Sequence, residues 1–267
     1  MWEIFVHSVR SGVRGRSIHG TLAVGILLIG VAYLSSAFSP RQPAAVALDV
    51  GLSGIRFALV LFALVWVNEL IGKEIERKTV MFSLAYPVPR SYFVLGRYLG
   101  ALFLLAVAVA VLGGILVLAV MQGGAGLDAR FQKALDVAYF ATLAGLWLDV
   151  AVVMAFATLI ACLSTVPFLA VALGALFAIM GKSLGAVIDY LQHGEGADSA
   201  LAAQYGPVLD VAKWILPDLS RLDWRAWPMY DMQPAMGAMG LAVASALIYM
   251  ALMLALAILA INRRQYA

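Results

Sequence analysis

Residues 181–185 carry two motifs whose residue types could do chemistry. They read Gly-Lys-Ser-Leu-Gly, which has the Gly-x-Ser-x-Gly form of a serine hydrolase and the Gly-Lys-Ser of a phosphate-binding loop. A hydrolase needs a strand–turn–helix around its serine and a nearby histidine, but Ser183 lies in an apolar helical run and His193 falls in a loop. A phosphate-binding loop needs glycine where Leu176 stands, and a strand before it. We therefore expect no nucleotide or cofactor site in this chain.

Potential metal ligands are few. Four methionines recur at helical spacing and would share one face of a helix: Met229, Met232, Met236 and Met239. Thioethers suit Cu(I), but methionine also serves as flexible apolar packing at a membrane edge, so both interpretations stay open. His193 and Glu195 lack a third ligand, so a zinc site is not expected there. The single cysteine, Cys162, excludes a disulfide framework within the chain.

Asp149 is an acidic residue in the middle of a long apolar run. An isolated charge at that depth in a membrane costs several kcal/mol, so the carboxylate must find a partner or face a watery cavity. One interpretation is structural, with Asp149 paired to Arg56 or Lys182, or protonated and hydrogen-bonded. The other places Asp149 in a translocation path. An enzyme acting within the membrane through Ser183 or Asp149 is a further alternative.

The composition is that of an integral membrane protein. The chain has 267 residues, of which 64% are hydrophobic and 12% charged, whereas soluble domains have about 25% charged residues. A spanning helix needs about 20 apolar residues. Pro167 divides one run that is too long for a single helix, because proline disfavours helix before it. We therefore expect six spans, at 17–38, 54–72, 98–121, 137–163, 167–189 and 235–261.

The distribution of charge predicts the orientation. Lysine and arginine favour the cytoplasmic side of a membrane. Placing both termini inside gathers one group of basic residues there: Arg10, Arg14, Arg16, Lys73, Arg77, Lys78, Arg90, Arg97, Arg263 and Arg264. Most acids then lie outside: Asp49, Asp128, Asp136, Asp189, Glu195, Asp198, Asp210, Asp218, Asp223 and Asp231. We expect residues 190–234 to form an extracytoplasmic loop, which could bind a partner on that side.

Two flanking segments have patterns of their own. Residues 1–17 place Trp2, Phe5, Val6, Val9 and Val13 at helical spacing opposite charged residues, which predicts an interfacial helix with its basic face toward anionic lipid headgroups. The same helix could also touch a cytoplasmic partner. In the outer loop, the apolar residues 208–216 are expected to dip into the interface. Trp214, Trp224, Trp227 and Tyr230 resemble an aromatic belt.

Residues 69–100 join a dense charged cluster, an apolar–charged pattern and a Pro-x-Pro-Arg break between two spans. The apolar spacing predicts a short amphipathic helix ended by Pro87 and Pro89. This stretch resembles the loop between the second and third spans of ABC-2-type transporter permeases, where a pattern like E-x-E-x-x-T, P-x-x-R and L-G-(K/R) recurs. The matching residues are Glu74, Glu76, Thr79, Pro87, Arg90, Leu95, Gly96 and Arg97. Lys78 stands where many members carry glycine, which leaves the subfamily open.

The resemblance implies an all-α fold, with an N-terminal interfacial helix and six spans forming one permease domain over residues 1–267. It implies a non-catalytic subunit of an ATP-driven exporter in the bacterial cytoplasmic membrane. ATP and Mg would bind a separate ATP-binding subunit, and a second permease copy or paralogue would complete the pathway. The ATPase would contact the cytoplasmic loop 73–97, through Glu74, Glu76, Arg77, Lys78, Thr79, Pro87 and Arg90. A membrane assembly or sensor subunit that transports nothing is the remaining alternative. No nucleic-acid partner is expected.

Overall fold

The computed structural model describes residues 2–39, 42–72, 90–122, 137–164, 166–193 and 217–263. Its regular elements in these ranges are all helical. Within these ranges, six helices are long and apolar enough to cross a membrane, which agrees with the six spans expected. The coupling residues from Glu74 to Pro87 and the outer segment 208–216 lie outside the described residues.

The helices run in chain order as follows: α1 (Trp2–Arg14), α2 (Arg16–Ala37), α3 (Pro43–Val67), a π-helix η1 (Asn68–Gly72), α6 (Arg90–Gln122), α8 (Val137–Leu163), α9 (Pro167–His193), a 3₁₀ turn η2 (Leu219–Leu222), α11 (Ala226–Tyr230) and α12 (Met236–Arg263). The break before Pro167 is confirmed, with the proline as first residue of α9. His193 ends α9 and does not fall in a loop.

Two spans begin earlier than predicted. The second starts at Pro43 and not at residue 54, since proline favours the first turn of a helix, and it therefore includes Asp49. The third starts at Arg90 and not at residue 98, so residues 90–97 form helix instead of loop. Both predictions used uninterrupted apolar residues to find the ends. Both predicted starts were placed too late, because charged side chains that find partners inside the bundle were treated as lying outside the helix.

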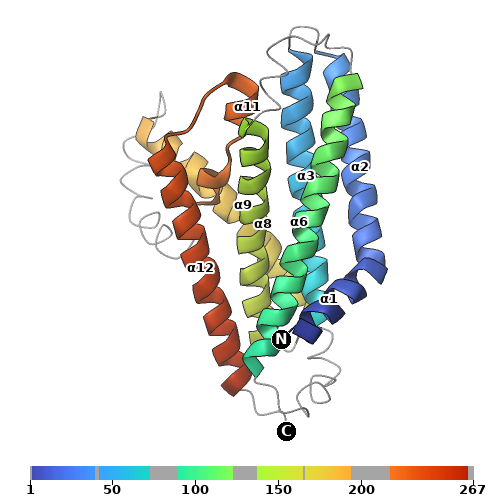
Figure 1. Ribbon diagram of the computed structural model, residues 1–267. Coiled ribbons are helices and arrows are strands. Elements are labelled where there is room, and N and C mark those ends of the chain that lie inside the picture. The colour runs from blue at the N-terminus through green and yellow to red at the C-terminus, as the bar shows by residue number, and fades with distance from the viewer. Residues whose placement is uncertain are drawn as a thin grey trace.

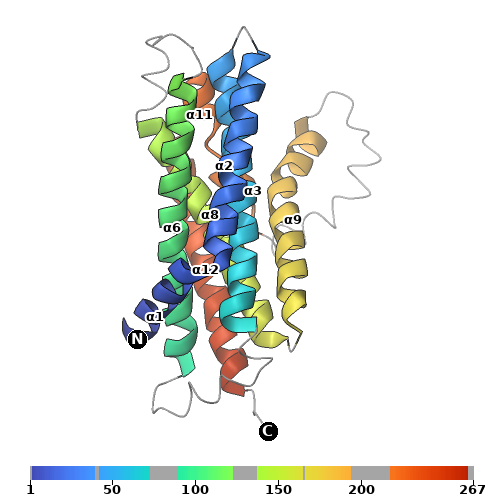
Figure 2. The ribbon, with the colours of Figure 1, turned by 90° about the vertical axis from the view of Figure 1, so that its right-hand side faces the viewer.

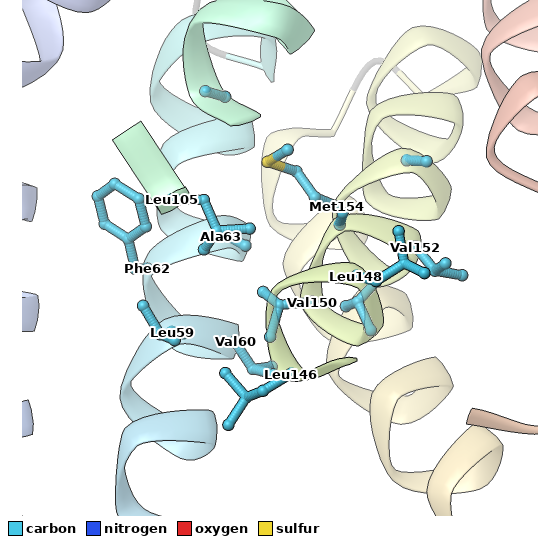
Figure 3. Packing of buried hydrophobic residues seen from close by; sticks show 14 of the residues in the cluster. Leu59, Val60, Phe62, Ala63, Leu105, Leu146, Leu148, Val150, Val152 and Met154 are labelled. Atoms are coloured by element: carbon cyan, nitrogen blue, oxygen red, sulfur yellow. The ribbon is translucent and has the colours of Figure 1, made fainter. Parts of the chain in front are cut away.

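The six long helices stand side by side, and α8 lies at their centre (Figures 1 and 2). It packs against α3, α6, α9 and α12. Most of α8 is buried, including the run from Val150 to Ala155. Figure 3 shows apolar side chains from α3 and α8, with Leu105 of α6, at this contact. A helix that is apolar all round belongs in the interior, which accounts for the position of α8.

Helix α1 lies across the end of the bundle that also holds the C-terminal end of α12 (Figure 1). It leaves the long axis of α2 at a sharp angle beside Gly15 (Figure 2). At the opposite end, the chain from Pro217 to Ala235 returns to the helices through η2 and α11. Helices α1 and α11 thus lie toward opposite ends of the bundle, and the side of the membrane that each end faces stays a prediction.

Helix α11 ends at Tyr230, and the next residue, Asp231, has a left-handed φ of 58°. The amides of Asp231 and Met232 donate to the carbonyls of Trp227 and Ala226, which closes the helix end. Residues 231–235 are not helical, and α12 starts at Met236. The four methionines therefore do not share one helical face, and the geometry expected for a copper site is not formed by a single helix.

Candidate functional site

Six charged side chains meet where the segment after η2 packs against the bundle, and we call them the charge cluster. They come from α3, α8, α9 and the segment that follows η2: Asp49, Arg56, Asp149, Lys182, Asp223 and Arg225. Three are acidic and three basic, so the charge cluster is neutral when all are ionised. Each member makes at least one ion pair with another member.

The deepest pair joins Arg56 of α3 to Asp149 of α8. The Arg56 Nε lies 2.5 Å from Asp149 Oδ2, and one Nη lies 3.4 Å from Oδ1. The guanidinium also donates to the carbonyl of Ala178 on α9, at 3.4 Å. The side chain of Asp149 is 4% exposed and that of Arg56 is 21% exposed. Charged groups removed from water must be paired, and this contact supplies the partner.

Asp223 forms the second centre of the charge cluster. It accepts from Lys182 Nζ at 2.5 Å and from Arg225 in a bidentate contact, with both N–O distances at 2.7 Å. Burial alone would raise the pKa of Asp223, but hydrogen bonds from Arg225 and the charge of Lys182 outweigh it. The pKa therefore lies well below its usual range. Hydrogen bonding to Asp223 raises the pKa of Arg225, against the effect of burial.

Arg225 connects this centre to the N-terminal half of α3. Its Nη1 donates to Asp49 Oδ1 at 3.0 Å and to the Ser53 hydroxyl at 2.5 Å. Asp49, Ser53 and Arg56 occur at i, i+4 and i+7, so all three lie on one face of α3. The same face of α3 therefore contacts both centres of the charge cluster. Arg56 contacts Asp149, and Asp49 and Ser53 contact Arg225, which holds Asp223.

The segment from Pro217 to Arg225, which we call the return segment, brings Asp223 and Arg225 into place. Asp218 caps η2 by accepting from the amide of Ser220 at 3.1 Å, and the Trp224 indole donates to the carbonyl of Arg221. Leu219, Leu222 and Trp224 are buried. Trp224 was expected to belong to an aromatic belt, but it is part of the packed interior.

Three glycines on α8 and α9 make room for the return segment. A Cβ at Gly145 would lie 2.5 Å from the carbonyl oxygen of Leu222. At Gly185 it would lie 1.9 Å from the Ser220 hydroxyl, and at Gly181 it would lie 2.8 Å from Leu219. Gly181 and Gly185 are the two glycines of the Gly-Lys-Ser-Leu-Gly motif. Their spacing serves close packing of a neighbouring chain segment.

A small cavity of about 20 Å³ lies within the charge cluster, enough for about one water molecule. Arg56, Asp149, Lys182, Asp223 and Arg225 line it, and Leu52, Thr142, Leu146, Leu222 and Trp224 complete its wall. The cavity is thus polar on one side and apolar on the other. The charged side chains that line this cavity are paired with one another.

The other predicted site residues lie apart from the charge cluster or outside the described residues. The Ser183 hydroxyl donates to the carbonyl of Ile179 in its own helix at 2.9 Å, and His7 and His19 belong to α1 and α2. The described residues thus contain no serine–histidine pair. They also contain no group of three histidine, cysteine or acidic residues that could hold a metal ion. Met229 packs against the core, whereas Met232 and Met236 are exposed.

Sequence reasoning identified Asp149 and both candidate partners, and the structure selects Arg56 as the direct one. It missed Asp223, Arg225 and Asp49, because all three were assigned to the outside by charge alone. A signal was available on α3, where Asp49, Ser53 and Arg56 repeat at helical spacing inside an otherwise apolar run.

Comparison with known proteins gives one relevant similarity, and no family model matches the chain. The chain is 31% identical over 126 residues to the "Probable ABC transporter permease protein NosY" of Stutzerimonas stutzeri. The similar region covers 45% of this chain and 45% of that protein. The chain thus matches less than half the length of this relative. Together with the six apolar helices, the similarity supports a multi-pass membrane permease.

Proposed function

We propose that this chain is the transmembrane subunit of an ATP-driven exporter of the ABC-2 type, in the cytoplasmic membrane of a bacterium. The observation that carries the proposal is a bundle of six spanning helices with a paired charge cluster in its interior. The similarity to an ABC transporter permease supports it independently. Nucleotide and Mg belong, in this proposal, to a separate ATP-binding subunit.

The charge cluster is the part of the bundle best suited to open. Apolar residues of similar volume would hold α3, α8 and α9 together at least as well as buried ion pairs do. Ion pairs also leave polar walls when they separate, so water can enter the space between them. We therefore place the translocation route at the charge cluster, with Asp149 on its wall and the return segment as the element that withdraws.

The inner ends of α3 and α6 are suited to receive force from the ATP-binding subunit. They flank residues 73–89, so both helices must respond when this segment moves. Helix α3 ends in the π-helix η1, a form found often at functional positions. Arg97 of α6 donates to the carbonyl of Leu70 in η1, which ties the two helices together. Arg56 lies on the same helix as η1, which gives a route from the loop to the charge cluster.

In this proposal two copies of the chain, or one copy and a paralogue, assemble with two ATP-binding subunits. Six spans enclose only half of a pathway. Glu74, Glu76, Arg77, Lys78, Thr79, Pro87 and Arg90 are the proposed contacts of the ATP-binding subunit, with the loop and both termini in the cytoplasm.

The test is co-purification of this chain with candidate ATP-binding proteins of the same organism, followed by assay of ATP hydrolysis in proteoliposomes. We expect the combined change Glu74→Ala, Glu76→Ala and Arg90→Ala to dissolve the complex or uncouple its ATPase activity, with membrane insertion intact. The matched control removes two acids and one base from the outer loop, by Glu195→Ala, Asp198→Ala and Lys213→Ala. Full coupled activity in the first variant would refute the assigned contact. Failure of any ATP-binding protein to co-purify would refute the proposed function.

A further inference from the structure

Helix α1 has three distinct faces. One face is charged or polar and includes Glu3, His7, Arg10 and Arg14. The apolar residues predicted to form a single opposite face divide in two. Phe5 and Val9 are half-buried toward the bundle, while Trp2 is 74% exposed and Val13 is 53% exposed.

Small residues make the closest contact between α1 and the bundle. Ser8 and Gly12 are the buried residues of the helix, one turn apart. A Cβ on Gly100 of α6 would lie 2.7 Å from Ser8 Cβ, and a Cβ on Gly12 would lie 1.6 Å from the Trp66 ring. The close contact between α1 and the bundle is made by the narrow face that carries Ser8 and Gly12. Most of the apolar face of α1 is therefore not covered by protein.

The uncovered part forms a wide, open groove of about 360 Å³ that is lined by residues of α1. Its walls are Phe5, Val6, Val9 and Val13, with Arg10 and Arg14 along one edge. Unlike the cavity in the charge cluster, this groove is apolar over most of its surface. It therefore suits a ligand with a hydrocarbon part and an anionic part.

The apolar surface of α1 continues onto α6. The Phe5 ring packs edge-on against Phe103 of α6, with centroids 6.0 Å apart. Phe103 lies about one turn beyond Gly100, further from the start of α6 at Arg90. Phe103, Val107 and Val111 are each at least 40% exposed, which continues the apolar surface along α6. A chain of hydrocarbon can thus extend from α1 along the side of the bundle.

The two arginines provide the anionic end of the site. Arg10 and Arg14 are one helical turn apart, so their guanidinium groups can reach the same phosphate. Within the described ranges, neither forms an ion pair with a carboxylate. Glu3 and His7 lie on the same side of α1 but do not line the groove. The charge facing this edge of the groove is therefore positive.

We propose that this groove binds one anionic phospholipid, with its phosphate between Arg10 and Arg14. One acyl chain lies against Val6, Val9 and Val13 and continues past Phe103. The proposal goes beyond a general attraction to the membrane surface, because it assigns one place on the protein: the open groove along α1, its two arginines, and the exposed Phe103 of α6 that touches Phe5. It does not depend on the proposed transport function, so lipid binding can be tested without a substrate or an ATP-binding subunit.

The experiment is native mass spectrometry of the full-length protein in detergent, titrated with phosphatidylglycerol or phosphatidylcholine of the same chains. We expect the first phosphatidylglycerol to bind about 25-fold more tightly, since each basic residue near an anionic headgroup contributes about fivefold. Arg10→Gln with Arg14→Gln should remove most of this preference. The control, Arg221→Gln with Arg263→Gln, has the same net charge and should keep it. Val6→Ser with Val13→Ser should weaken both lipids alike.

Equal binding of phosphatidylglycerol and phosphatidylcholine to the unaltered protein would overturn the proposal. Because this comparison needs no variant, it tests the proposal even if a variant fails to insert into the membrane. Equal loss of the preference in the control variant would also overturn it, since the effect would then be one of net charge. Displacement of phosphatidylglycerol by inorganic phosphate at equal concentration would show a simple anion site and would refute binding of a lipid.

Discussion

Removal of the Asp149 carboxylate tests what the deepest ion pair contributes. Breaking a buried pair by deleting one partner costs about 3–5 kcal/mol, because the other charge stays buried. Arg56 is 21% exposed and keeps the Ala178 carbonyl, so the lower end applies, about 3 kcal/mol for Asp149→Leu. At about 2–4 °C per kcal/mol, the midpoint of thermal unfolding should fall by about 6–12 °C. Asp149→Asn should cost less, since its amide oxygen still accepts from Arg56.

Two further variants separate pairing from other effects in the same assay, thermal unfolding of the purified protein in detergent. Arg56→Met with Asp149→Leu removes both charges and should recover most of the lost stability. Asp49→Asn is the control, since Asp49 is 57% exposed and such a pair contributes at most about 1 kcal/mol. If Asp149→Leu unfolds at the same temperature as the unaltered protein, the pair is not stabilising. If the double variant is as unstable as Asp149→Leu, the loss comes from packing.

If Asp149 also lines the route, Asp149→Asn should impair transport while assembly is preserved.

Three other predictions follow from the packing, the pKa of Asp223 and the topology. Gly145→Val should cost several kcal/mol by forcing the Leu222 carbonyl away, whereas Gly114→Val, with open space around it, should change unfolding little. Because the pKa of Asp223 is lowered, its contribution is complete above its ordinary pKa of about 4 and is lost only in strong acid. The difference in unfolding temperature between the unaltered protein and Asp223→Asn should thus stay constant from about pH 5 to 8, and a steady decline across this range would contradict the assignment. In a Cys162→Ala background, an impermeant thiol reagent should label Ser199→Cys but not Ser91→Cys in intact cells; the reverse would overturn the orientation.

Much of the fold could be predicted because a membrane allows few alternatives. Unpaired backbone groups are excluded from lipid, so each long apolar run must become a helix. Pro167 marks the boundary between two spans within the run that was too long for a single helix. The ends of α3 and α6 were predicted wrongly because Asp49, Arg90 and Arg97 interrupt the apolar pattern. Arg97 is buried beside the Leu70 carbonyl and the Phe93 ring, contacts that hydropathy cannot reveal.

The charge cluster could be predicted only in part. The cost of an isolated Asp149 required a partner, and basic residues in neighbouring spans were few enough to suggest Arg56 or Lys182. The return segment brings Asp223 and Arg225 to Lys182 through contacts far apart in sequence, and no local pattern predicts such a contact. Gly145, Gly181 and Gly185 hold the signal in retrospect, because glycines on facing helices indicate a closely packed neighbour.

The central claim is that ATP hydrolysis on a partner subunit moves the return segment away from α9. The most direct measurement is the distance between spin labels at Arg221→Cys in the return segment and Val187→Cys on α9, both exposed positions, in a Cys162→Ala background. The protein would be reconstituted with its ATP-binding subunit and measured with and without nucleotide trapped by vanadate. We predict that trapping shifts the distances to longer values, and that Asp223→Asn shifts them partly without nucleotide. Identical distances in both states, in a complex that hydrolyses ATP, would contradict the account.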